Sequence, residues 1–323
     1  MVKRERWSLL VLTGMLGACA WGNGVSRAPS PALISRSLQP VLTLAGARLA
    51  LPDGTGLPLP HFAPAPYTRF ISPVAAAAGG PDYYVADAGA SRIYRYDPAM
   101  DAMTVVPGIA ARTDTRLFVG PDLSLFVVEP GARRVGRYSR DGRLLAAYAD
   151  VLNLAHPVAA AWDERRGRLL VADRIYNQLM AFQGVGRAAY VIALRGDERH
   201  GVRSIADIAI GARGIYLSDP VCRCIAVATD DGRVVATFGH NVIGQPGALA
   251  VDDHERIYVA DVFTHTIRIF SGVRETEQIP ASALGMVQVS DLSTQRDMLV
   301  VADAAGAKVM VLRLAPPAAG GGD

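Results

Sequence analysis

The sequence has few cysteines, few aromatic residues and little charge of either sign. Three cysteines in 323 residues cannot form the disulfide framework of a small secreted scaffold. Charged residues make up 20% of the chain and hydrophobic residues 50%, which excludes a disordered or solvating chain. The net charge of +3 is too slight to indicate nucleic-acid binding. We therefore expect a large buried core and no nucleic acid among the partners.

The N-terminus has the anatomy of an export signal. Lys3, Arg4 and Arg6 precede an apolar segment at residues 7–16. That segment has the length of a signal-peptide hydrophobic region and is shorter than the roughly 20 residues of a membrane span. The next residues read Leu16-Gly17-Ala18-Cys19. This motif resembles the bacterial lipobox, whose cysteine receives a diacylglycerol thioether before cleavage in front of it.

The lipobox resemblance implies a location. Residues 1–18 would be the signal peptide, and Cys19 would carry the lipid that attaches the protein to a membrane. Ala20 follows the cysteine, which in Gram-negative lipoproteins favours sorting to the outer membrane. We expect an outer-membrane lipoprotein that faces the periplasm. Residues 19–40 contain Gly, Ser, Pro and Arg with little hydrophobic pattern, so they predict a flexible tether.

One short motif recurs six times in the rest of the chain. Tyr84-Val-Ala-Asp87 and the six residues after it align without a gap with Tyr258-Val-Ala-Asp261 and its continuation. In every copy an acidic residue lies six positions before a branched aliphatic residue, at intervals of 42, 44, 46, 42 and 42 residues. The six acids are Asp87, Glu129, Asp173, Asp219, Asp261 and Asp303. A fixed period of roughly 40 residues indicates a repeat architecture.

Each period contains signals for four strands. β-rich runs lie on both sides of the acid, with turn residues between them. Apolar runs of small residues lie upstream at 74–78, 158–162, 208–210 and 248–251, and outer strands after Asp-Gly turns are indicated at 143–148 and 233–238. Four strands per period is a propeller blade. We predict an all-β fold, a six-bladed β-propeller of four-stranded antiparallel blades over residues 41–315.

The last blade is one strand short. After Gly285 the pattern indicates strands at 286–290, 298–302 and 309–314. The strand-like segment at 41–50 precedes the first blade, so we predict that this N-terminal strand completes the last blade and closes the ring. Residues 316–323 contain Pro316-Pro317 and three glycines and predict a loose tail.

The copies resemble NHL repeats, whose core is a valine-alanine-aspartate turn, small residues, a basic residue and an Ile-x-x-aromatic strand. Residues 87–96 and 261–270 match this pattern best. Glu129 replaces the aspartate in the second copy, and Ala228 stands at the aromatic position in the fourth. The resemblance covers residues 41–315.

The repeated acids are interpreted as structural. An aspartate at the head of a tight turn accepts hydrogen bonds from the next backbone amides. Related catalytic propellers, the amidating lyases and gluconolactonases, place His or carboxylate ligands around a divalent metal near the axis. The residues after the prolines that open inner strands here are Val74, Val158 and Gly247, none of which is a ligand. We predict no metal and no cofactor, while His156, His240 and the loop 195–203 stay open as loop-borne ligands.

Cys222 and Cys224 are separated by one residue. Side chains at i and i+2 of an extended segment point the same way, with Cα atoms near the upper limit for bridging. We expect a local disulfide or two thiols without a catalytic task.

The face that carries the six turns is the expected binding surface. Residues four and five after each acid, with exposed neighbours, form a basic and aromatic rim: Arg92, Arg133, Arg134, Arg174, Tyr176, Arg223, Phe263 and His265. Such a mixture is enriched at binding surfaces. The alternative is that these arginines pack along their own turns.

The sequence thus predicts a lipid-anchored cell-envelope propeller. Its role would be a binding or assembly scaffold for an envelope protein or an anionic glycan or peptide. The alternative function is a metal-dependent lyase or lactone hydrolase on the same fold, which rests on fold analogy.

Overall fold

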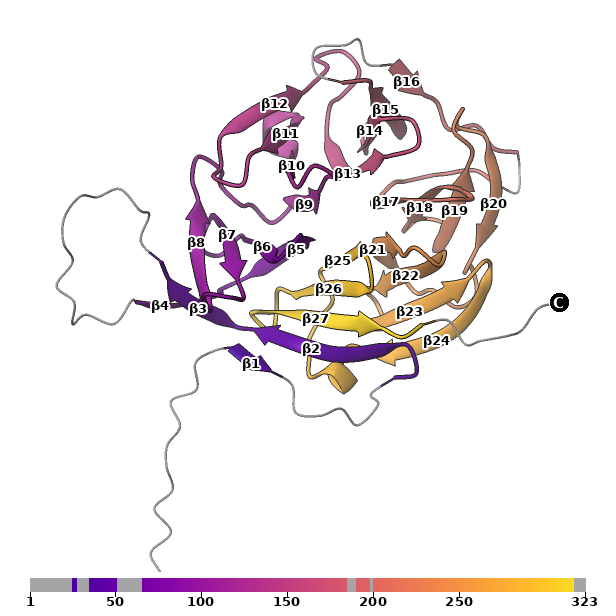
Figure 1. Cartoon of the computed structure of the whole chain (residues 1–323). Helices are drawn as coiled ribbons and strands as arrows, with labels where there is room; N and C mark the ends of the chain where they lie inside the picture. Colours follow the sequence, from indigo (N-terminus) through magenta and orange to yellow (C-terminus); the bar gives the residue numbers. More distant parts are fainter. Residues whose placement is uncertain (1–24, 28–34, 51–65, 185–189, 198–199, 317–323) are drawn as a thin grey trace, which may run out of the picture.

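The computed structural model describes residues 25–27, 35–50, 66–184, 190–197 and 200–316. Within these ranges the chain is nearly all β and forms six blades arranged in a ring (Figure 1). The predicted six-bladed β-propeller is therefore confirmed. The predicted signal peptide, Cys19 and the predicted tail after Pro316 lie outside the described residues. No helix in the described part of the chain is long and apolar enough to cross a membrane.

The first three blades run in chain order. Blade 1 contains β5 (Pro73–Gly79), β6 (Asp82–Asp87), β7 (Arg92–Asp97) and β8 (Ala102–Val106). Blade 2 contains β9 (Arg116–Val119), β10 (Leu125–Glu129), β11 (Arg134–Tyr138) and β12 (Leu144–Tyr148), with the 3-10 turn η1 (Pro130–Ala132). Blade 3 contains β13 (Pro157–Asp163), β14 (Arg168–Asp173), β15 (Gln178–Phe182) and β16 (Tyr190–Ile192).

The remaining blades complete the ring. Blade 4 contains β17 (Asp207–Gly211), β18 (Gly214–Asp219), β19 (Cys224–Ala228) and β20 (Val234–Phe238). Blade 5 contains β21 (Pro246–Val251), β22 (Arg256–Asp261), β23 (Thr266–Ser271) and β24 (Arg274–Pro280), followed by η2 (Ala281–Leu284). Blade 6 contains β25 (Asp291–Gln295), β26 (Met298–Asp303), β27 (Lys308–Leu314) and the N-terminal strand β2 (Leu38–Leu44).

The ring is closed by the N-terminal strand, as predicted. β2 pairs antiparallel with β27 from Leu38 opposite Leu314 to Leu44 opposite Val309, so this N-terminal strand and the last strand lie side by side (Figure 1). The predicted segment 41–50 is not one strand, however. β2 begins at Leu38, and after Ala45 the chain enters β3 (Gly46–Leu49), which joins blade 1. Gly46 has a φ of +149°, a conformation that favours glycine.

Two blades carry additional strands at their outer edges. β3 pairs in parallel with β8, and β4 (Tyr67–Arg69) pairs with β3. β1 (Val25–Arg27) pairs with β2 in blade 6, within the stretch expected to be a tether. These strands cover the edges that β8 and β2 would otherwise expose.

The predicted strand at 286–290 is wrong. Those residues form the loop that enters blade 6, and the inner strand is β25. The reason is the acid anchor: the amides of Val287 and Gln288 donate to the Asp303 carboxylate at 2.8 and 3.1 Å. An amide bonded to a side chain cannot also bond to a neighbouring strand.

The core lies between neighbouring blades. Inner strands carry small residues, and Ala75, Ala76 and Ala77 of β5 are fully buried. Larger side chains such as Tyr84, Phe126 and Tyr258 are also buried, farther from the axis. Because six inner strands converge on one axis, small residues there let the strands approach while the aromatic residues fill the wider space outside.

Candidate functional site

Five of the six repeated acids are structural, as predicted. Asp87 accepts hydrogen bonds from Ala90 N in its own turn at 3.1 Å, and from Ile71 N and Ser72 N in the preceding loop, both at 2.8 Å. Asp173, Asp219, Asp261 and Asp303 repeat this arrangement. All five are at most 1% exposed. Each carboxylate ties the turn to the loop that enters the inner strand, so its oxygens are not available to a ligand.

Glu129 departs from this pattern. Its carboxylate accepts from Arg134 Nε at 2.8 Å and from the Tyr138 hydroxyl at 3.1 Å. Burial, followed by the charge of Glu129, raises the pKa of Tyr138 to about 12. The longer acid therefore pairs with side chains of its own blade instead of amides of the neighbouring loop.

We call the surface that carries the six acid-headed turns the turn face. It contains all of the predicted rim residues. The fourth residue after each acid, which includes Arg133, Arg223 and His265, has a left-handed backbone with φ between 51° and 56°. This left-handed residue lies in the turn between the acid and the following strand. Most of the eight predicted side chains are exposed, with Arg134 half-buried.

Three of the predicted arginines make intramolecular contacts: Arg92 interacts with the Tyr94 hydroxyl of its own strand, and the other two are in blade 2. Arg133 donates to the carbonyl oxygens of Leu154 and Val151 at 3.2 and 3.1 Å, and Arg134 forms a two-point pair with Glu129. These two side chains hold the turn of blade 2 and the next interblade loop. For these two arginines the alternative interpretation holds, in which the side chains pack along their own turns.

Apolar side chains are exposed on the turn face. Phe263 is 74% exposed and Tyr176 48%. The acid turns and entering loops add six further large apolar residues, each 58–81% exposed: Ile71, Val151, Leu152, Ile175, Val221 and Val287. Turns on the opposite face expose three among the described residues: Met100, Leu123 and Val273. Exposed apolar surface is therefore concentrated on the turn face, which is typical of an interaction surface.

A second site lies on the propeller axis and was not predicted. A cavity of about 570 Å³ is lined by β9, β13, β17, β21 and β25. Glu164 and Arg296 line it from turns on the opposite face, and three further charged residues, Arg116, Asp207 and Asp291, form what we call the axial site. They are the first residues of β9, β17 and β25, the inner strands of alternate blades. Arg116 Nε lies 3.9 Å from Asp291 Oδ1.

The axial carboxylates also join neighbouring blades. Asp207 Oδ2 accepts from Leu249 N of blade 5 at 2.8 Å. Asp291 Oδ2 accepts from Ala76 N of blade 1 at 3.2 Å. Each aspartate thus reaches the amide of the next inner strand, while its side chain is at most 8% exposed.

Burial changes the ionisation of this pair. It raises the pKa of Asp207 to about 6 and that of Asp291 to about 7, and Arg116 partly opposes both shifts. The charge of Asp207 contributes to the higher value of Asp291. Near neutral pH the axial site therefore takes up and releases protons, which is a property of general acid–base groups.

The axial residues were missed because their positions are occupied by alanine elsewhere. Ala75 and Ala159 pair with the residue before the acid anchor, as Arg116, Asp207 and Asp291 do. The inner strands of blades 2, 4 and 6 also lack the opening proline after which a ligand is expected. A charged residue 12 or 13 positions before the anchor was the available signal.

The open metal alternatives are not brought together. Among the residues that the structure describes, one group of three His, Cys, Asp or Glu side chains has the spacing of a metal site: Cys222, Cys224 and His240. His156 is not in it. In the loop at 195–203, Asp197 accepts from the His200 amide at 2.8 Å and lies 2.8 Å from its ring Nδ1.

The axial site itself does not suit a divalent metal. Its two carboxylates face a guanidinium, which supplies the positive charge that a cation would otherwise bring. Each carboxylate already accepts backbone amides. Hard cations require six or more oxygen ligands, and the described axial residues do not supply them.

Cys222 and Cys224 are joined by a disulfide with Cα atoms 5.3 Å apart. The segment is not extended, because Arg223 between them has a φ of 56°. This turn is the reason that two cysteines so near in sequence can be bridged.

Comparisons with known proteins identify the fold. No protein-family model matches the chain, and no curated protein sequence matches it. Among solved structures, virginiamycin B lyase from Staphylococcus aureus is similar with a TM-score of 0.57 and 11% identity, over 76% of this chain and 96% of that one.

Two further structures are similar at the same level. A gluconolactonase from Xanthomonas campestris has a TM-score of 0.58 and 14% identity, over 76% of this chain and 87% of its own. A Bacteroides thetaiotaomicron protein of unknown function has a TM-score of 0.60 and 15% identity, over 76% of this chain and 70% of its own. At these identities the likeness extends to the six-bladed propeller fold.

Proposed function

We propose that this protein is a lipid-anchored cell-envelope propeller that binds a partner protein through its turn face. The observation that carries the proposal is the concentration of exposed apolar side chains on that face, led by Phe263 at 74% exposure. Aromatic residues and arginine dominate the energetics of protein interfaces. The turn face has both, since Arg92, Arg174 and Arg223 are exposed beside Tyr176 and Phe263.

The charge of the turn face favours an acidic partner. The exposed arginines present guanidinium groups that match carboxylates in geometry as well as charge. Arg133 and Arg134 are left out of this proposal because they hold the fold. The resemblance to NHL repeats and to the lipobox supports a propeller held near the membrane by the lipid on Cys19, which raises its local concentration there.

The test compares the two faces of the propeller in cells. A photo-crosslinking amino acid is placed at position 263 on the turn face or at position 273 on the opposite face, where Val273 is 66% exposed. We expect one discrete envelope-protein adduct from position 263 and none from position 273. A further exchange of Arg174 and Arg223 for Ser should weaken the adduct at 263 without lowering the melting temperature. Equal adduct patterns from both positions would contradict the proposal.

The lipid is tested separately. Mass spectrometry of the N-terminal peptide should find diacylglycerol on Cys19 and no residue before it. Cys19→Ser should leave an unprocessed chain without lipid. Cleavage at another position, with Cys19 unmodified, would refute the anchoring part of the proposal.

A second candidate function is supported by the axial site. Two buried carboxylates with raised pKa values beside an arginine, at a cavity of about 570 Å³, suit acid–base catalysis on a small polar molecule. Asp207 or Asp291 would accept a proton while the other donated one, and Arg116 would stabilise developing negative charge. Lactone hydrolysis or an elimination fits this arrangement, in line with the lyase and gluconolactonase among the similar structures.

The enzyme candidate has its own test. Turnover of a panel of lactones is compared between the wild type, Asp207→Asn and Asp291→Asn, with and without a chelator. We expect hydrolysis that each substitution lowers by about 100-fold or more and that the chelator leaves unchanged. Activity abolished by the chelator would instead assign the reaction to a metal and refute the axial mechanism.

A further inference from the structure

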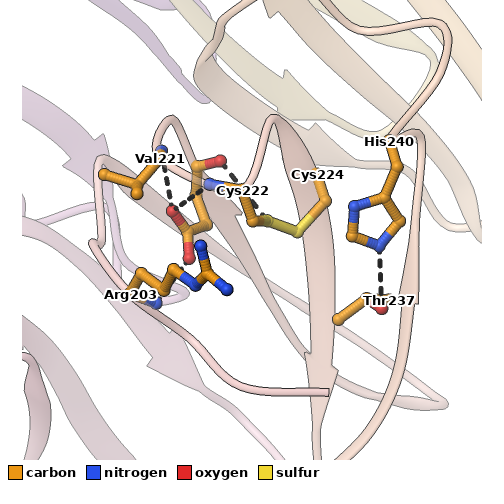
Figure 2. The surroundings of a disulfide bond; sticks show 7 residues. Arg203, Val221, Cys222, Cys224, Thr237 and His240 are labelled. Carbon is orange, nitrogen blue, oxygen red and sulfur yellow. Dashed lines mark hydrogen bonds between the residues drawn. A yellow bond between two sulfur atoms is a disulfide. The ribbon is translucent and has the colours of Figure 1, made fainter. Parts of the chain in front are cut away.

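The disulfide lies beside a histidine at the outer part of the turn face. Cys222 is in the turn after Asp219, Cys224 is the first residue of β19, and His240 follows β20 by two residues. β19 and β20 are paired, with Ile225 opposite Phe238, so the ends that carry Cys224 and His240 are adjacent. Figure 2 shows the imidazole of His240 next to Cys224.

These three residues have the spacing of metal ligands. The two sulfur atoms and one imidazole nitrogen all lie within 4.8 Å of one another. Zinc binds cysteine sulfur at about 2.3 Å and imidazole nitrogen at about 2.0 Å. A tetrahedral ion with these bond lengths would hold the two sulfur atoms about 3.8 Å apart and each about 3.5 Å from the nitrogen. The sulfurs must therefore separate after the disulfide opens, while the imidazole is already within reach. Two thiolates and one imidazole form a ligand set that binds zinc in preference to magnesium or calcium.

The histidine is oriented for this role. Its Nε2 lies 3.0 Å from the Thr237 hydroxyl oxygen, and Figure 2 shows this hydrogen bond as a dashed line. When Nε2–H donates to that oxygen, Nδ1 keeps its lone pair for a metal. A hydrogen bond on the far nitrogen of a metal-binding histidine fixes the ring and its tautomer.

We infer that Cys222, Cys224 and His240 form a redox-gated zinc site. In the disulfide form both sulfurs are bonded to each other and the site is closed. A dithiol reductant opens it by exchange: the reductant becomes a cyclic disulfide, and Cys222 and Cys224 each gain a hydrogen. Zn²⁺ then replaces the two thiol protons, which pass to water, and His240 Nδ1 supplies the third ligand. The fourth position is left to water or to a group from a partner.

The position of the site gives it a consequence for the turn face. Arg223 and Val221 belong to the same turn and are both exposed. Opening the disulfide and binding a cation change the charge of that turn. Zinc binding to the reduced protein would therefore alter the turn face of blade 4 without changing the ring.

The test uses the full-length chain with Cys19→Ser, which leaves Cys222 and Cys224 as its only cysteines. The protein is reduced with a phosphine, which becomes a phosphine oxide as water supplies its oxygen and the two protons. Excess reagent is removed without oxygen, and zinc is measured by elemental analysis after gel filtration. We expect one zinc per reduced chain and none per oxidised chain. Cobalt in place of zinc should give a sulfur-to-cobalt charge-transfer band and tetrahedral visible bands.

Matched variants separate ligands from bystanders. Cys222→Ser with Cys224→Ser should abolish binding, and His240→Ala should raise the Kd by tenfold or more. Thr237→Val should raise it to a smaller extent, since outer partners contribute about 10- to 100-fold or less. His254→Ala, an exposed histidine on the opposite face, should leave the Kd unchanged. The proposal would be overturned if the double cysteine variant took up as much zinc as the reduced parent chain, or if His240→Ala did not change the Kd.

A structural readout completes the test. The circular dichroism spectrum of the reduced, zinc-free chain should match that of the oxidised chain, because the turn is also held by Asp219 through Val221 N and Cys222 N. Loss of the β spectrum on reduction would also overturn the proposal, since the site requires the native turn.

Discussion

The Nε atom of Arg116 lies 3.9 Å from the Oδ1 atom of Asp291, although the two residues start the inner strands of blades 2 and 6. Asp207, from blade 4, interacts electrostatically with both residues: Arg116 lowers the pKa of Asp207, and the charge of Asp207 raises the pKa of Asp291. Alternate blades thus supply charges to one site on the axis, and the blades between them supply alanine at Ala75 and Ala159. Small residues in the intervening blades leave room for the longer side chains.

The first prediction concerns the pH dependence of stability. The pKa of Asp207 is about 6 and that of Asp291 about 7 in the folded protein, against 3.8 for an unperturbed aspartate. Between pH 4 and 7 the folded state therefore binds protons that the unfolded state does not, so stability falls as pH rises through this window. We expect a loss of roughly 4 kcal/mol from pH 5 to pH 8, since the two shifts add and each pKa unit corresponds to about 1.4 kcal/mol.

Urea unfolding at each pH measures this loss. Asp291→Asn should show a flatter profile than the wild type, because the amide does not ionise. Asp253→Asn, an exposed residue, serves as control and should retain the wild-type slope. Identical slopes for the wild type and Asp291→Asn would contradict the assignment of the raised pKa.

A second prediction concerns the arginine. Arg116 opposes the rise in pKa of both aspartates, so its removal makes their ionised forms less favourable. Arg116→Gln should destabilise the protein by roughly 2 kcal/mol at pH 8 and by much less at pH 5, where the carboxyls are protonated. This prediction is checked by measuring the free energy of unfolding of Arg116→Gln and of the wild type at pH 5 and at pH 8. An equal loss at both would mean that Arg116 contributes through packing and not through charge.

The architecture was predictable because one local device is repeated. An aspartate that binds the amides of its own turn is readable from spacing alone, and its count and interval set six blades of four strands. The ring closure followed from a strand missing in blade 6. The boundary at Ala45 did not, because the change from β2 to β3 depends on pairing with β8, far along the chain.

The site was less predictable than the ring. Arg116, Asp207 and Asp291 are separated by 91 and 84 residues in the sequence, from 207 minus 116 and 291 minus 207. Only closure brings them together, and each resembles an ordinary charged residue beside a strand. For the rim arginines, the repeat predicts that they are exposed but not which of them have partners. Arg134 pairs with Glu129, the one acid that departs from the repeat.

The third prediction concerns the acid anchor of blade 6. Asp303 is fully buried and accepts from Gly306 N, Val287 N and Gln288 N. Asp303→Ala leaves three amides without their acceptor, which should lower the free energy of unfolding by roughly 2–4 kcal/mol. Asp297→Ala, whose carboxylate is mostly exposed, should change it by less than about 0.5 kcal/mol. Denaturant melts of both variants measure the difference, and a similar small effect in both would show that the anchor is dispensable.

The fourth prediction tests closure of the ring. Leu44 of β2 is fully buried and lies opposite Val309. Leu44→Ala should destabilise the propeller by about 3 kcal/mol, because the inward side chain leaves a cavity between blades. Leu144 of β12 also lies on an outermost blade strand but is 46% exposed, so Leu144→Ala should cost less than about 1 kcal/mol. Thermal and denaturant unfolding of the two variants compare a strand that closes the ring with one that only edges a blade. A loss for Leu44→Ala no larger than that for Leu144→Ala would mean that β2 is peripheral and that β25, β26 and β27 hold blade 6 without it.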